Sequence, residues 1–281
     1  MTHSGKTAGI VEGHRARKRF GQNFLSDQGI IDNIVSAIAP GSEDLLVEIG
    51  PGLGALTAGL IERVDQLHVV ELDKDLIPFL IAKFEHTGKL RIHQADALQF
   101  DFSQLREGGA ADSKLRVVGN LPYNISTPLI FHLIDQAHHI QDMHFMLQKE
   151  VVERLAAGVG DKAYGRLGIM VQYFCQVEPL FEVPPESFNP PPKVNSAIVK
   201  LTPHDRLPVA TRDPGLLRTL VTQAFSMRRK TLRNALKPLI SADQLEAAGV
   251  SPSLRPEQIS LADYVLITEY LIDSGTYHPE K

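Results

Sequence analysis

Short apolar runs alternate with amphipathic patterns along the first half of this 281-residue chain. The stretch "LSDQGIIDNIVSAIA" has helical spacing, with Ser26 or Asp27 as its N-cap. Buried strands are predicted for "DLLVEIG", "QLHVVELD", "KLRIHQAD", "LRVVGN" and "MHFMLQ". Residues with helical spacing follow four of these runs. Strands that alternate with helices predict an α/β, Rossmann-like fold, a parallel sheet between two layers of helices.

The pattern changes near residue 176, where "VEPLFEVPPESFNPPPKVNSAIVKLTP" has two strand-like ends around a proline-rich middle. The prolines forbid a helix there, so we expect antiparallel strands at the edge of the sheet. From Asp213 onward the spacing is helical throughout. We therefore predict a catalytic domain over residues 1–205 and a small all-helical domain over residues 206–281. The first 14 residues are expected to be disordered.

Composition excludes several classes of protein and site. The one cysteine, Cys175, excludes internal disulfides and a cysteine-rich metal site, and the histidines lack partners at metal-ligand spacing, so no metal is expected. Neither a run of eighteen apolar residues nor an apolar leader segment is present, so we expect no membrane span and a cytoplasmic location.

The net charge of −4 hides an uneven distribution. The segment "SMRRKTLRNALK" is predicted to be a helix, and acidic residues predominate after residue 240. A helix would place Arg229, Arg233 and Lys237 on one face, where they could contact RNA phosphates. Charge alone leaves open whether this face is only solvated. The basic residues assigned to RNA binding are Arg228, Arg229, Lys230 and Arg233.

A glycine-rich loop follows the first predicted strand. Gly50, Gly52 and Gly54 in "VEIGPGLGALT" allow the backbone to approach a ligand closely, and Glu71 at the end of the second strand can accept hydrogen bonds from ribose hydroxyls. These features suit NAD and S-adenosylmethionine (SAM) equally. Asp96 ends the third strand and could accept a bond from the amino group of a bound adenine, which favours SAM. Taken by itself, Asp96 would be better interpreted as the cap of a turn.

The tetrapeptide Asn120-Leu121-Pro122-Tyr123 follows the fourth strand, at the same edge of the sheet. An adenine N6 amine is a poor nucleophile, and two acceptors aimed at its hydrogens would help it attack a methyl group. The Asn120 side-chain oxygen and the Leu121 carbonyl can be those acceptors, and Pro122 restricts the backbone of Leu121. The Tyr123 ring offers a face on which a flipped-out base can stack. A fortuitous turn at the end of the strand is the alternative.

These motifs resemble those of the bacterial small-subunit ribosomal RNA adenine N6,N6-dimethyltransferases, from about residue 15 to 272. The matching segments are "KRFGQNFL", "EIGPGLGALT", "ELDKDL", "QADAL", "GNLPYNIS", "FNPPPKVNSAIVKL" and "AFSMRRKTLRNAL". The related erythromycin-resistance methylases of large-subunit RNA are the nearest alternative, and "PPPKVNSAIV" and "RRKTLRNAL" favour the small-subunit enzymes.

The resemblance implies a SAM-binding Rossmann-like domain followed by a small helical domain. It implies that SAM is bound by Asn23, Leu25, Gly50, Gly52, Glu71, Asp96 and Asn120. The implied substrate is two adjacent adenines in the 3′-terminal hairpin loop of small-subunit RNA, each of which receives two methyl groups within assembling subunits. We expect the enzyme to act as a monomer.

Phe188 is a second candidate for stacking on the target base, and a core position under the loop is an equally good interpretation. Two other functions stay open at this point. A DNA-adenine or glutamine-amide methylase also uses an Asn-x-Pro-Tyr turn, and a non-catalytic assembly factor could retain the fold. The presence of Glu71, Asp96, Asn120 and Tyr123 together argues against lost catalysis.

Overall fold

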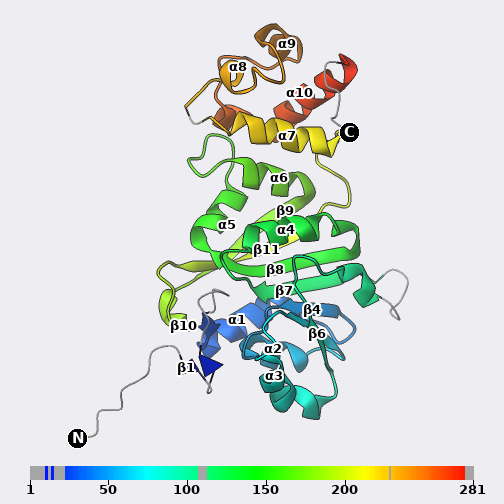
Figure 1. Ribbon diagram of the computed structural model, residues 1–281, viewed down its shortest axis with the longest axis vertical. Helices are drawn as coiled ribbons and strands as arrows, with labels where there is room; N and C mark the ends of the chain where they lie inside the picture. The colour runs from blue at the N-terminus through cyan, green and yellow to red at the C-terminus, as the bar shows by residue number, and fades with distance from the viewer. Residues whose placement is uncertain (1–9, 12–13, 16–22, 107–112, 228, 276–281) are drawn as a thin grey trace, which may run out of the picture. The chain divides into compact units, whose positions relative to one another are not determined.

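The computed structural model describes residues 10–11, 14–15, 23–106, 113–227 and 229–275. A seven-stranded sheet runs through it in the order β6-β5-β4-β7-β8-β11-β9 (Figure 1). The parallel strands are β4 (Leu45–Ile49), β5 (Leu67–Glu71), β6 (Leu90–Gln94), β7 (Leu115–Asn120) and β8 (Ile140–Gln148). These strands lie at the five predicted runs, which confirms the parallel sheet.

The proline-rich segment completes the edge of the sheet. Strands β9 (Cys175–Val183) and β11 (Ser196–Pro203) flank it, and β11 pairs antiparallel with β8, as predicted. Because β11 lies between β8 and β9, the order departs from that of dinucleotide-binding folds, in which the sixth strand adds directly to the fifth. Within the segment, β10 (Phe188–Asn189) pairs with β3 (Phe24–Leu25), which precedes the first helix.

The helices of the catalytic part begin close to their predicted positions. They are α1 (Gln28–Ile38), α2 (Ala55–Ile61), α3 (Ile77–Phe84), α4 (Ser126–Ile134) and α5 (Lys149–Ala156). Asp27 is the N-cap of α1, because its carboxylate accepts a bond from the Ile30 amide. None of the described helices is long and apolar enough to cross a membrane.

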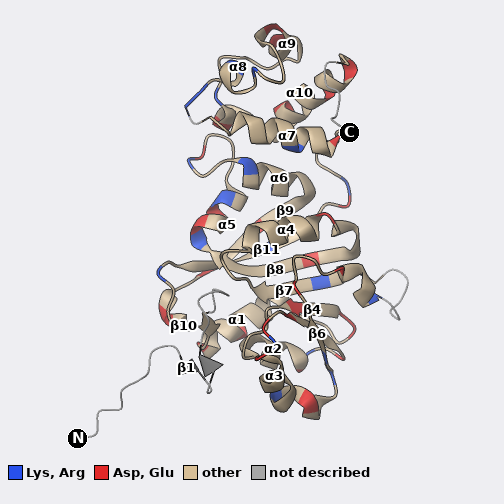
Figure 2. Cartoon of the chain, in the orientation of Figure 1, with Lys and Arg blue, Asp and Glu red and all other residues tan. Residues whose placement is uncertain are grey.

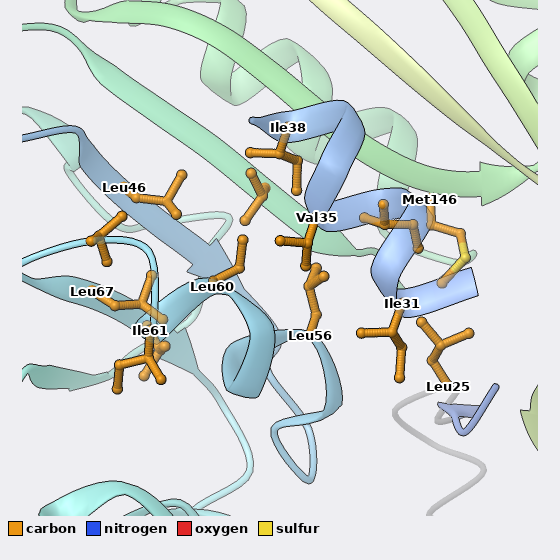
Figure 3. Close-up of a cluster of buried hydrophobic side chains, with 14 of the residues drawn as sticks. Leu25, Ile31, Val35, Ile38, Leu46, Leu56, Leu60, Ile61, Leu67 and Met146 are labelled. Atoms are coloured by element: carbon orange, nitrogen blue, oxygen red, sulfur yellow. The ribbon is translucent and has the colours of Figure 1, made fainter. Parts of the chain in front are cut away.

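One hydrophobic cluster holds α1 and α2 on the sheet. The apolar stripe of α1, which includes Ile31, Val35 and Ile38, points toward Leu56 and Leu60 of α2 (Figure 3). The stripe has the i, i+4, i+7 spacing that the sequence shows, so burial of one helix face explains why this segment folds as it does. The cluster also contains Leu25 of β3 and Phe188 of β10, which are paired with each other.

The chain divides into two compact units, and the second includes more than the sequence pattern predicts. It comprises Glu153–Val177 and His204–Lys281, whereas the sequence pattern predicts that the catalytic domain extends to residue 205. The first of these segments contains α6 (Arg166–Phe174), which the hydrophobic pattern did not reveal and which contacts α7 (Pro214–Ala224). The Tyr164 hydroxyl donates to the Ile259 carbonyl at 2.8 Å, so a distant partner binds the segment to this unit.

The structure differs from two predictions, one for the basic segment and one for the N-terminus. The predicted helix through "SMRRKTLRNALK" is wrong: α8 spans only Leu232–Ala235, and Arg229 has a φ of 67°. A left-handed residue cannot continue a helix, so Arg229, Arg233 and Lys237 do not form a helical stripe. At the N-terminus, residues 1–9 and 12–13 of the segment expected to be disordered lie outside the described residues. β1 (Ile10–Val11) and β2 (His14–Arg15) form a short antiparallel pair.

The remaining helices lie in the second unit. They are α9 (Ala242–Ala247) and α10 (Leu261–Asp273), each with a capping box at its start. Ser241 caps α9 and Ser260 caps α10, so both helices begin where the sequence shows a serine followed by a polar residue at the third helical position.

Candidate active site

The glycine loop gives the cavity a wall of bare backbone. Gly50, Gly52 and Gly54 have φ values of 66°, 59° and 76°, a region that residues with a Cβ avoid. A Cβ on Gly54 would lie 2.5 Å from the Phe84 ring, whereas one on Gly50 would meet no atom within 4 Å. Gly54 therefore permits close packing of the loop on α3, and Gly50 leaves open space in front of the backbone for a ligand.

Glu71 closes the second strand with a fixed carboxylate. Its Oε1 accepts from the Asp73 amide at 2.7 Å and its Oε2 from the Gly52 amide at 3.3 Å. Burial raises the pKa of Glu71 above its ordinary value, and the two backbone bonds oppose this shift. The carboxylate therefore joins the glycine loop to the end of β5 and stays oriented toward the cavity that both line.

A second buried carboxylate lies beneath the loop. Glu48 accepts a bond of 2.6 Å from the Thr57 hydroxyl of α2, and burial raises the pKa of Glu48 to about 7. The sequence analysis did not single out this residue. A buried acid within an otherwise apolar strand is the signal that could have identified it.

Asp96 lies where the third strand meets the cavity. Its Oδ1 accepts from the Leu98 amide at 3.0 Å, so the turn-capping role that the sequence left open is present. Asp96 also lines the cavity together with Glu71. The two roles are compatible, because a carboxylate has two oxygens and accepts several bonds.

The tetrapeptide after β7 is held at both ends. The Asn120 Nδ2 donates to the Asn23 carbonyl at 3.2 Å, and the Tyr123 hydroxyl lies 2.8 Å from the Ser196 hydroxyl of β11. The first bond fixes which side of the Asn120 amide is the donor, so its oxygen remains the acceptor for a ligand. The Leu121 amide donates to the Met146 carbonyl of β8 at 3.2 Å. This bond anchors the backbone between Asn120 and Tyr123.

These residues line a single cavity of about 600 Å³, a volume typical of small-molecule sites. The predicted residues that contribute to it are Asn23, Leu25, Gly50, Gly52, Glu71, Asp96, Asn120, Leu121, Pro122 and Tyr123. The loop offers bare backbone, Glu71 and Asp96 offer acceptors at the ends of successive strands, and Asn120 offers a third. This donor and acceptor set fits SAM, which carries ribose hydroxyls and an adenine amine as hydrogen-bond donors.

Phe188 is not among the cavity residues. It is 4% exposed, pairs with Leu25 and packs in the cluster around α1, so this structure has it in the core position that the sequence allowed. A stacking role would require the ring to become exposed, and that role stays a prediction. Phe24, Lys83 and His144 also line the cavity and are not predicted from the sequence. The Phe24 ring covers Gly52, and the Lys83 ammonium donates to the Leu53 carbonyl at 3.1 Å.

The basic residues assigned to RNA binding belong to the helical unit. Arg228 lies outside the described residues. Arg229 and Lys230 are exposed in the loop between α7 and α8, and Arg233 is exposed on α8. Figure 2 shows this loop in blue, whereas α9 and α10 carry acidic side chains. The cluster is therefore a charged loop rather than a helical stripe. No group of histidine, cysteine and acidic side chains in the described part of the chain could hold a metal ion.

The strand order, the glycine loop, the two acids and the tetrapeptide together define a SAM-dependent methyltransferase that acts on a planar amine. Comparison with known proteins identifies the family. The family model "Ribosomal RNA adenine dimethylase" matches residues 13–273. This chain therefore belongs to the ribosomal RNA adenine dimethylase family, and SAM is its methyl donor.

Individual relatives agree with this membership. The chain is 60% identical, over 94% of its length and 94% of the relative's, to a protein of Marinobacter nauticus named "Ribosomal RNA small subunit methyltransferase A". A dimethyladenosine transferase from Plasmodium falciparum is similar in structure, with a TM-score of 0.77 and 29% identity, covering 90% of this chain and 98% of that one. The 23S rRNA methyltransferase ErmE has a TM-score of 0.68 at 24% identity, covering 89% and 100%, which shows a shared fold alone.

Proposed function

We propose that this enzyme transfers two methyl groups to the N6 amine of each of two adjacent adenines in the 3′-terminal hairpin loop of small-subunit ribosomal RNA. Identity of 60% to a small-subunit methyltransferase supports the choice of RNA. The observation that carries the chemistry is the fixed Asn120 amide, whose Nδ2 is engaged by the Asn23 carbonyl while the residue lines the cofactor cavity.

The chain's own residues prepare the amine. The Asn120 oxygen and the Leu121 carbonyl accept hydrogen bonds from the two N–H groups of the amine. These bonds favour a tetrahedral nitrogen with an available lone pair. The Tyr123 ring, held by Ser196, supplies the face on which the base stacks. SAM, when bound, supplies a methyl group on a positively charged sulfur. Catalysis then rests on positioning and on dipoles that are oriented before the reaction.

Methyl transfer to defined RNAs tests this function. Labelled SAM should methylate unmethylated small subunits, and nucleoside mass spectrometry should find N6,N6-dimethyladenosine at two adjacent positions. Already methylated subunits, large-subunit RNA and adenine-containing DNA are the controls and should take up no label. Dimethyladenosine in large-subunit RNA, or label in DNA, would contradict the proposed substrate, and methylated protein would indicate an amide methylase.

The basic loop should provide part of the RNA affinity. Reversing Arg229 and Arg233 to glutamate is expected to weaken binding of small subunits by roughly tenfold or more, because each arginine can neutralise a phosphate. The wild-type affinity should fall with salt, with a log–log slope of roughly −0.7 to −0.9 per phosphate, and the variant's slope should be shallower. Filter binding at several salt concentrations measures both.

A matched control separates this loop from charge reversal in general. Arg255 is exposed in the same unit but lies outside the basic loop, so Arg255→Glu should leave the slope unchanged. SAM affinity should be unchanged in both variants. Equal subunit affinity and an equal slope in the double variant would show that the loop does not contact RNA.

The setting of the reaction follows from the substrate. We place the enzyme in the cytoplasm, on assembling small subunits, because the target hairpin must be accessible to be drawn into the cavity. We expect it to act as a monomer.

A further inference from the structure

One buried polar side chain in the cavity wall is left unexplained by the roles assigned above. His144 of β8 is 3% exposed, and both its ring nitrogens lack a hydrogen-bond partner in the structure. Buried polar groups nearly always have such a partner, so an unsatisfied one calls for a ligand, a water or a proton-handling role. His144 lines the same cavity as Asn120 and Tyr123.

A carboxylate lies beside the ring of His144. The Asp142 carboxylate lies 3.6 Å from its Nδ1 and is itself held by the Arg116 guanidinium at 3.1 Å. Arg116 is anchored in turn by Asp44 and by the Ile38 carbonyl at the end of α1. A carboxylate beside Nδ1 favours the tautomer with its proton there, which leaves Nε2 as an acceptor at the ring tip.

The strand register places His144 near the reacting amine. Met146 is paired with Asn120, and His144 lies two residues before Met146 in β8, with its side chain on the same face of the sheet. Strand spacing puts the Cα atoms of His144 and Asn120 roughly 8 Å apart, a gap that two side chains and one water can span. Figure 3 shows Met146 on this face, pointing toward Ile31 and Leu25.

Methyl transfer releases a proton that the two acceptors cannot take up. The amide oxygens of Asn120 and Leu121 are too weakly basic. The titratable residues that line the cavity are Glu71, Lys83, Asp96, Tyr123 and His144. Glu71 and Asp96 end the strands at the nucleoside part of the site and accept backbone bonds, Lys83 is a cation, and the Tyr123 hydroxyl is engaged by Ser196. His144 is the basic group on the strand beside Asn120.

We propose that His144, oriented by Asp142, accepts through one water the proton released from the adenine amine in each methyl transfer. The proposal rests on the proposed function. As the N6 lone pair bonds to the methyl carbon, the electron pair of the carbon–sulfur bond stays on sulfur. The N6 proton passes to the water, which gives one of its own protons to Nε2. The imidazolium that forms lies beside the Asp142 carboxylate and returns its proton to solvent between turnovers.

Charged side chains lie around His144 on the neighbouring strands. Asp142 lies on the same strand, Arg116 on β7 is bonded to Asp142, and Lys200 is the residue of β11 in register with His144. Glu48 on β4 is in register with Val118 of β7, and Val118 is in register with His144. The face of α1 toward the sheet is apolar. A histidine accepts a proton only in its neutral form, so the single-turnover rate should rise with pH between pH 6 and pH 8.

Single-turnover methyl transfer across this pH range tests the proposal. His144→Gln keeps an acceptor but cannot take up a proton, and it should react roughly tenfold or more slowly at pH 7 and lose the rise with pH. SAM affinity and the melting temperature should change little. His132→Gln is the matched control, because His132 bonds the Phe100 carbonyl outside the cavity and should behave as wild type.

Two further measurements test the proposal even if His144→Gln does not fold. A wild-type rate that is flat between pH 6 and pH 8 would overturn the proposal without any substitution. His144→Ala should regain rate when free imidazole is added, whereas a merely structural histidine would show no such rescue. A wild-type rate and pH profile in His144→Gln would also overturn it. The absence of dimethyladenosine in every RNA would instead refute the proposed function.

Discussion

Replacing Asn120 by alanine should lower the single-turnover rate by roughly 100- to 1,000-fold while small-subunit affinity changes little. The magnitude is typical for loss of one dipole that is oriented before the reaction. The Asn120 amide is held in one orientation by the Asn23 carbonyl, so the wild-type side chain needs no rearrangement when the amine enters. Rapid-quench transfer with saturating SAM and subunits measures the rate, and filter binding measures the affinity.

Two matched variants make this result interpretable. Asn124→Ala removes an exposed amide that also lines the cavity, and it should keep most of the activity. Asn120→Asp retains an acceptor oxygen but loses the donor to Asn23, so an intermediate rate is expected. If Asn120→Ala reacts at a near-normal single-turnover rate, the proposed role of its oxygen is wrong.

The second large effect should be on cofactor affinity. Replacing Glu71 by glutamine or alanine should weaken SAM binding by roughly 100-fold, because hydrogen bonds to a charged acceptor contribute about 1.5–3 kcal/mol each. Alanine also removes both bonds that join Glu71 to Gly52 and Asp73, and glutamine, with one acceptor oxygen, removes one of them, so the glycine loop loses a support. Titration calorimetry with SAM measures the affinity. Glu85→Gln is the control, because Glu85 is an exposed carboxylate directly after the last residue of α3.

Acidification should have a related effect on the wild-type enzyme. Burial raises the pKa of Glu71 above its ordinary value of 4.5, so its carboxylate gains a proton at a higher pH than an exposed glutamate does. SAM affinity should therefore weaken as the pH falls. Glu71→Gln should lose this pH dependence. An unchanged SAM affinity in that variant at neutral pH would show that Glu71 does not contact the ribose.

The sequence predicted the parallel part of the fold well because two of its strands are followed by residues that disfavour a strand. Glycines close β4, and Asn120 with Pro122 closes β7, so the helices that follow could be placed to within a few residues. The same punctuation predicted the cavity, since parallel strands bring their carboxyl ends to one edge of a sheet. Gly50, Glu71, Asp96 and Asn120 meet there for this reason.

Other features depend on contacts between distant segments, and local sequence patterns do not predict such contacts. The Tyr164 bond to Ile259 assigns the α6 segment to the helical unit. Pairing with Leu25 places Phe188 in the core. The positive φ of Arg229 ends the predicted basic helix, although arginine is a good helix former. His144 was missed because a strand buried on both faces reads as one apolar run, which does not show where a polar residue points.

The position of β11 between β8 and β9 has a consequence for the order in which the nascent chain can fold. β9 is synthesised before β11, but β11 is its neighbour in the sheet, so β9 has no partner there until residues 196–203 have emerged. Until then β8 also presents a bare edge, with unpaired backbone groups of the kind that promote aggregation. The Ser196 hydroxyl that holds Tyr123 arrives with the same strand. Completion of the sheet and final placement of the stacking ring are therefore a single late event in synthesis.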